Sequence, residues 1–120
     1  MNEIQLGVVE AKFADIIWNN EPISSSELVK ICEKELEWKK STTFTVLRRL
    51  CQKGIFQNIE GTVTSLISKD EFYSLQSERF VEETFQGSLP AFLAAFTSRK
   101  GLSPEEVATL RRMVEEYEEG

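Results

Sequence analysis

Histidine is absent from all 120 residues of the chain. Histidine is the commonest general base, the usual partner of a nucleophilic serine or cysteine, and a frequent zinc ligand, so most hydrolases and most zinc sites are disfavoured. Glu82-Glu83 and Glu105-Glu106 are adjacent carboxylates in predicted helices. Neighbours in a helix point in different directions and do not converge on one substrate. We therefore expect no enzyme activity, no cofactor and no metal site.

Cysteine is scarce, and long apolar runs are missing. Cys32 and Cys51 are single, with no CxxC motif, and are expected to be two buried apolar thiols. No 18-residue apolar stretch exists, so we expect no membrane insertion. Residues 1–23 lack the basic start and apolar run of a signal peptide, which favours a cytoplasmic protein. With 41% hydrophobic and 28% charged residues, the chain is expected to form one globular domain or two very small ones.

Acidic side chains are missing from one segment of an otherwise acidic chain. Residues 39–53, KKSTTFTVLRRLCQK, hold five cations and no carboxylate, although the net charge is −6. Residues 1–68 carry 8 basic and 9 acidic side chains, whereas residues 69–120 carry 6 basic and 11 acidic ones. The basic segment therefore lies in a nearly neutral first part, followed by an acidic second part.

Three serines, each followed three residues later by glutamate, predict helix starts. These capping boxes begin at Ser24, Ser68 and Ser103 and predict helices over 24–36, 69–86 and 104–118. Apolar periodicity predicts a further helix over 8–19 and a short one over 89–97. The basic segment is expected to form a helix that opens at Ser41 and ends at Gly54.

Two short β-branched runs follow Gly54. They are IFQNI and TVTSLI, separated by Glu60-Gly61, and they predict a two-stranded hairpin. The expected fold is mainly α with a small β-hairpin wing. It would comprise a winged helix-turn-helix domain over residues 1–68 and an α-helical dimerisation arm over residues 69–120.

The two sides of the basic helix differ in chemistry. Thr43, Val46, Leu47 and Leu50 fall on one side, with Cys51 at its edge, and Phe44 is expected at the edge of the core rather than on a base. Arginine, glutamine and threonine can pair with base edges in the major groove, and cations at a helix start attract phosphate. A solvated basic helix is the alternative interpretation. The candidate DNA-binding residues are Lys39, Lys40, Ser41, Thr42, Thr45, Arg48, Arg49 and Gln52.

The second part of the chain carries more apolar surface than about 50 residues can bury. A two-fold partner would cover it, which predicts a homodimer, although packing against the chain's own winged domain is the alternative. The candidate dimerisation residues are Phe72, Leu75, Phe80, Phe92, Phe96, Val107, Leu110, Val114 and Tyr117.

Residues 38–55, WKKSTTFTVLRRLCQKGI, resemble the recognition-helix signature of the penicillinase-repressor family of winged-helix regulators. The matching positions are Trp38, Ser41, Thr42, Thr45, Leu47, Arg49, Leu50, Lys53 and Gly54. The likeness extends upstream to Glu10 and IIWNNEP, and downstream to Ser68 and the GSL at 87–89. It implies a repressor that binds a palindromic double-stranded operator as a homodimer.

The resemblance also implies a mode of induction. In the best-known members a membrane sensor detects a β-lactam, and the repressor is then cleaved in its dimerisation domain. The matching bond here is Ala95–Phe96, but the cleaved members have Asn-Phe at this place. The wing also departs from the family pattern, because Glu60-Gly61-Thr62 carries no cation. A winged-helix protein-interaction module with weak or lost DNA binding is therefore the alternative function.

Overall fold

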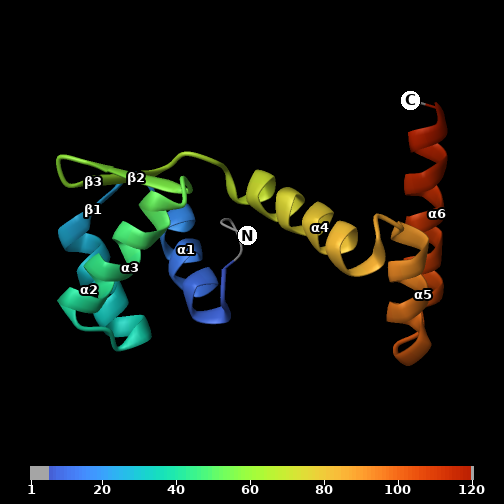
Figure 1. Cartoon of the computed structure of the whole chain (residues 1–120), viewed down its shortest axis with the longest axis horizontal. Coiled ribbons are helices and arrows are strands. Elements are labelled where there is room, and N and C mark those ends of the chain that lie inside the picture. The colour runs from blue at the N-terminus through green and yellow to red at the C-terminus, as the bar shows by residue number, and fades with distance from the viewer. Residues whose placement is uncertain (1–5, 120) are drawn as a thin grey trace. The chain divides into compact units, whose positions relative to one another are not determined.

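The computed structural model describes residues 6–119, which form helices and three short strands in the order drawn in Figure 1. None of the helices in this range is both long and apolar enough to span a membrane. The elements are α1 (Val8–Asn20), β1 (Ile23–Ser24), α2 (Ser25–Leu36), α3 (Lys40–Gln52), β2 (Phe56–Ile59), β3 (Thr62–Ser65), α4 (Lys69–Phe85), α5 (Leu89–Arg99) and α6 (Pro104–Glu119).

The chain divides into two compact units, and the division lies within α4. The first unit extends to Ser77 and the second begins at Glu78. The sequence predicted a boundary at residues 68/69, before this helix. The first compact unit extends past this position because the first turn of α4 packs onto it. The division into a DNA-binding and a dimerisation domain stays a prediction. Each unit is described below by itself.

The first unit is a winged helix-turn-helix, as predicted. Three helices pack against an antiparallel sheet with strand order β1-β3-β2. The predicted hairpin is confirmed, with Phe56 opposite Ser65 and Ile59 opposite Thr62. The sequence missed β1, whose Ile23 and Ser24 pair with Val63 and Thr62. A two-residue strand has no periodicity, so only its pairing reveals it.

The capping serines begin the helices as predicted. The hydroxyls of Ser24, Ser68 and Ser103 accept hydrogen bonds from the backbone N–H groups of Glu27, Glu71 and Glu106 at 3.0–3.1 Å. At Ser103 the capping box is complete, because Glu106 Oε1 accepts from the Ser103 N–H at 2.9 Å. A fourth serine, Ser88, caps α5 in the same manner.

The start of α3 differs from the prediction. The helix begins at Lys40, with Lys39 in the capping position and no side-chain cap, so Ser41 lies inside the first turn. The turn from α2 has only three residues. Glu37 adopts a left-handed conformation, and the Trp38 ring packs on Phe13 with centroids 5.3 Å apart. This packing positions the chain so that the helix starts one residue early. Gly54, with φ of +83°, follows the end of α3 in the predicted left-handed conformation.

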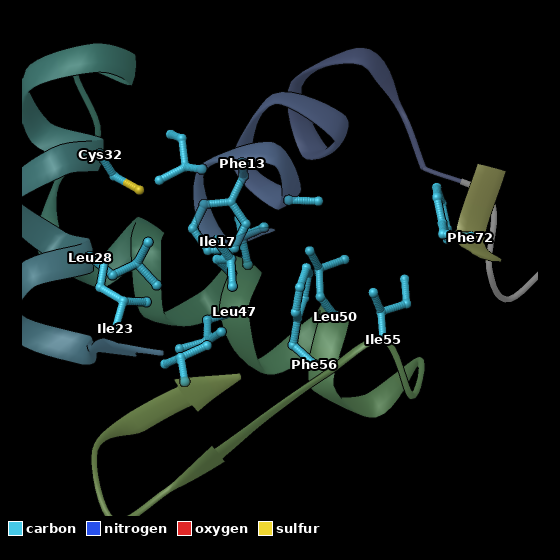
Figure 2. Close-up of a cluster of buried hydrophobic side chains, with 14 residues drawn as sticks. Phe13, Ile17, Ile23, Leu28, Cys32, Leu47, Leu50, Ile55, Phe56 and Phe72 are labelled. Carbon is cyan, nitrogen blue, oxygen red and sulfur yellow. The ribbon is translucent and has the colours of Figure 1, made fainter. Parts of the chain in front are cut away.

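The core of the first unit lies between the three helices and the sheet (Figure 2). Figure 2 shows side chains of α1, α2 and α3 gathered over the strands. The buried residues of α3 are Thr43, Val46, Leu47 and Leu50, the side predicted from the helical wheel. Other core members are Phe13, Ile17, Ile23, Leu28, Cys32, Ile55, Phe56 and Val63.

Trp18 attaches the first turn of α4 to this core. Its ring contacts Phe56, Phe72 and Tyr73, with centroids 5.3, 5.5 and 6.2 Å away. Its indole Nε1 donates a 3.1 Å hydrogen bond to the Ile67 carbonyl. Phe72 is 0% exposed, so its assignment to a dimer surface is corrected. The phenyl ring belongs to the core of the winged domain, because the tryptophan on α1 covers it.

The second unit has aromatic contacts but no deep core. Phe80 and Phe85 of α4 and Phe92 of α5 form edge-to-face contacts with centroids 5.6–6.0 Å apart, and Phe96 contacts Phe92. Between Glu78 and Glu118, the part of this unit whose side chains are described, no residue is fully buried. Several of its large apolar side chains are therefore partly exposed to water.

Replacing Phe72 by alanine should lower the free energy of unfolding of the winged domain by about 3–5 kcal/mol, because a buried phenyl ring leaves a cavity. Urea unfolding followed by tryptophan fluorescence measures this domain, since both tryptophans lie in it. The matched control is Ser74→Ala, two residues further along α4 and exposed. It should change stability by no more than about 0.5 kcal/mol. Equal effects of the two variants would contradict the packing described.

Candidate nucleic-acid interface

The outward side of α3 presents the residues predicted to bind DNA. All eight candidate residues are exposed, and two of them, Lys39 and Lys40, lie at the start of the helix. Arg48 makes no ion pair with any residue in the described part of the chain. The six exposed residues beyond the lysines are Ser41, Thr42, Thr45, Arg48, Arg49 and Gln52.

A carboxylate from another helix reaches this basic segment. Glu10, near the start of α1, accepts a 2.8 Å hydrogen bond from Arg49 and lies 3.8 Å from the Lys53 ammonium. Its other oxygen also accepts from the Gly7 N–H at 3.3 Å. The Arg49 guanidinium is the main reason that the pKa of Glu10 is held below its ordinary value, with smaller contributions from Gly7 and Lys53. Arg49 therefore has a fixed partner inside the protein, unlike Arg48.

Nothing in the sequence pairs Glu10 with Arg49, because 39 positions separate the two residues. No local pattern connects residues so far apart. The one available signal was the similarity of Glu10 to a family position. The structure adds that Glu10 is only 19% exposed, while the Arg49 side chain is 52% exposed. Arg49 thus has one nitrogen on Glu10, while about half of its side chain is open to solvent.

A groove runs along α3 beside Arg48. Its lining residues are Phe44, Leu47, Arg48 and Cys51 of α3 and Asn58 of β2, and its volume is about 260 Å³. Phe44 is half-buried and packs against the core at its edge, as predicted. The groove therefore has an apolar floor and a polar rim.

The wing is short and its tip is tied to the body of the domain. Glu60 and Gly61 both have positive φ, 52° and 86°, as a tight two-residue hairpin turn requires. The Gly61 carbonyl accepts a 2.8 Å hydrogen bond from the Ser25 N–H, and the Gly61 N–H donates to Asn58 Oδ1 at 3.0 Å. Residues 55–68 contain no lysine or arginine. The tip thus presents Glu60 and no cation to a neighbouring polyanion.

The two cysteines are free thiols and lie inside the first unit. Cys32 is buried and Cys51 is half-buried, close to the prediction of two buried thiols. Burial raises the pKa of the Cys32 thiol to about 11, and it also raises the pKa of Cys51. At neutral pH both remain protonated and poorly nucleophilic.

The bond matched to the family cleavage position lies in a helix. Ala95 and Phe96 are in the middle of α5, and both side chains are exposed. Phe96 also contacts the Phe92 ring, with centroids 6.2 Å apart. A protease needs an extended chain, so this segment must open locally before the bond can be cut.

Replacing Arg49 by glutamine should destabilise the winged domain near neutral pH by less than about 1 kcal/mol, because the pair is partly exposed. The lowered pKa of Glu10 means that the ion pair stabilises the fold above the ordinary glutamate pKa. This contribution is lost as pH falls through the lowered value. Urea unfolding at pH 7 and pH 3 should therefore show a difference from wild type that shrinks in acid. Arg48→Gln is the control and should show no such pH dependence; an undiminished Arg49→Gln difference at pH 3 would refute the pairing.

Comparison with known proteins agrees with this geometry. A family model described as penicillinase repressor matches residues 6–116. A penicillinase repressor of Bacillus licheniformis is 28% identical over 117 residues, which cover 94% of this chain and 91% of that protein. The methicillin resistance regulatory protein MecI of Staphylococcus aureus is 21% identical, covering 92% and 93% of the two chains. A penicillinase repressor of the same organism is 22% identical, covering 91% and 90%. Because the family model matches nearly the whole chain, the protein belongs to the penicillinase repressor family.

Proposed function

We propose that this protein is a transcriptional repressor that binds a palindromic operator as a homodimer and inserts α3 into the major groove. The observation that carries the proposal is the exposed side of α3, where Arg48 is unpaired among hydroxyl and amide side chains. Family membership supports the same function, since its named relatives are repressors or regulators.

The chemistry of α3 suits the edges of base pairs. Arg48 can donate two hydrogen bonds to guanine, and Gln52 can pair with adenine. Lys39 and Lys40 lie at the start of the helix, where free backbone N–H groups also favour a phosphate. Arg49 is held by Glu10, so we assign it to a phosphate position rather than to a base.

A homodimer is supported by the second unit. Exposed apolar side chains there include Phe80, Phe96, Val107, Val114 and Tyr117, while no described residue of the unit is fully buried. Leu75, Phe92 and Leu110 complete the proposed dimerisation surface after removal of Phe72. Two linked DNA-binding domains also gain affinity through effective concentration, which a single small domain with few phosphate contacts needs.

The regulated genes are proposed to form a β-lactam-resistance-type operon, because the relatives are named for penicillinase and methicillin resistance. Inactivation would follow proteolysis of Ala95–Phe96 after local opening of α5, with a membrane sensor protease acting indirectly. This chain has Ala95 where the cleaved members of the family have asparagine.

Arg48→Ala should weaken binding by about 1–3 kcal/mol on a cognate duplex and much less on random DNA. Fluorescence anisotropy with the protein's own upstream region, at several salt concentrations, measures both effects. Arg112→Ala on α6, also exposed, is the control and should change neither. Equal losses on cognate and random DNA would instead identify Arg48 as a phosphate contact.

A protein-interaction module is the second candidate function. The anionic wing tip and the net charge of −6 favour it. The same titration distinguishes the two functions, because such a module would form no sequence-specific complex with any duplex.

Val114→Asp should convert the dimer into a monomer, because a carboxylate would be buried in the proposed apolar interface. Val114 is 60% exposed in the single chain, so the substitution should leave each protomer folded. Sedimentation equilibrium measures the mass directly. Glu116→Ala, on the same helix, is the control and should remain dimeric. A wild-type chain that stays monomeric at high concentration would contradict the homodimer.

A further inference from the structure

The groove beside α3 has no role in the function proposed so far. Phe44 has one part packed on the core and another part lining the groove. Leu47 and Cys51 complete the apolar floor, and Arg48 and Asn58 provide polar groups. No carboxylate is among these lining residues. The groove is therefore an apolar slot with a cation beside it, on the side of α3 that is proposed to meet DNA.

Phe44 and Arg48 are one helical turn apart, so their side chains are neighbours on the helix surface. If Arg48 contacts one base pair, Phe44 is placed to contact a pair one or two steps away. The opposite rim of the groove is formed by Asn58, which lies in strand β2 of the wing. The groove is thus continuous with the proposed DNA-binding surface.

The major groove offers a single apolar group on its base edges, the C5-methyl of thymine, and phenylalanine is one of the side chains that contact it. The sequence favoured a core-edge role for Phe44 over contact with a base, but part of its ring also lines the groove. We propose that this part contacts a thymine methyl and makes thymine part of the recognised half-site. This inference rests on the proposed function and deepens it by naming a base. The positive charge of Arg48 favours a nucleic acid over an uncharged small molecule as the occupant of the groove.

Thr42 and Thr45 could also contact a thymine methyl, but they differ from Phe44 in two ways. Both are exposed in water, and each has a hydroxyl that can pair with phosphate or a base. Phe44 has no polar group, and its half-buried position limits the number of conformations it must lose on binding. The phenyl ring is therefore the side chain that discriminates through the methyl group alone.

The test removes that methyl group from the DNA. Duplexes that bind wild-type protein are first selected from a randomised library, and each thymine is then replaced singly by deoxyuridine, which lacks only the methyl. Replacing one particular thymine in each half-site should lower the affinity of the wild-type protein about three- to fivefold, because one methyl group is no longer buried. The Phe44→Ala variant should bind the thymine and deoxyuridine duplexes equally well. The Thr45→Ser variant should lose affinity on deoxyuridine as the wild-type protein does.

For each variant, the affinities for the thymine duplex and for the deoxyuridine duplex are measured on one protein preparation, and their ratio is compared between variants. A partly unfolded sample of Phe44→Ala lowers both affinities equally and leaves this ratio unchanged. Phe44→Leu, which keeps an apolar side chain, should show an intermediate ratio. The deoxyuridine scan on wild-type protein needs no variant, so it tests the inference even if Phe44→Ala fails to fold.

Three results would overturn the inference. A wild-type protein that tolerates deoxyuridine at each thymine has no methyl contact. A penalty that persists undiminished in Phe44→Ala places the contact on another residue. In both of these cases the selected duplex still binds, so the proposed function stands. A library that yields no enriched sequence removes the proposed function and this inference together.

Discussion

Burial of one side of α3 is the constraint on which the proposed interface depends. Val46, Leu47 and Leu50 pack against α1, α2 and the sheet, and this packing sets the rotation of the helix about its axis. Each residue advances the helix by a fixed angle, so the exposed positions follow from the buried ones. Ser41, Thr45 and Arg48 are outside because Leu47 and Leu50 are inside. The core thus orients the side chains proposed to contact DNA.

Charge is arranged unevenly within this frame. The chain is acidic as a whole, yet α3 presents cations and no carboxylate. Glu10 supplies the missing negative charge from α1 and neutralises part of the cluster at Arg49 and Lys53. The wing adds no cation. One protomer therefore has few groups to release counterions from DNA, and strong binding would require two copies acting together.

Much of the fold could be predicted because its signals are local. A serine followed by a glutamate three residues later reports a helix start, and Glu60-Gly61 reports a hairpin turn, without knowledge of distant residues. The predictions that failed involve contacts between distant parts of the chain. The strand at Ile23–Ser24 exists only through pairing with β3, and Phe72 is buried only because Trp18 covers it. The extension of the first compact unit to Ser77 depends on the same contact.

The sequence by itself determined the order of the helices and the hairpin, because their start and turn signals are local. It also determined the apolar stripe of α3 and the residue types on its outer side, since these depend on spacing along one helix. It also carried the family resemblance, which the comparisons support. Only the tertiary structure decided which cations of α3 have an internal partner. Arg48 and Arg49 are neighbours of identical chemistry, and the sequence cannot distinguish them. The packing of α1 beside α3 brings a Glu10 carboxylate oxygen within 2.8 Å of an Arg49 guanidinium nitrogen, although 39 positions separate the two residues. The same packing leaves Arg48 without an ion-pair partner among the described residues.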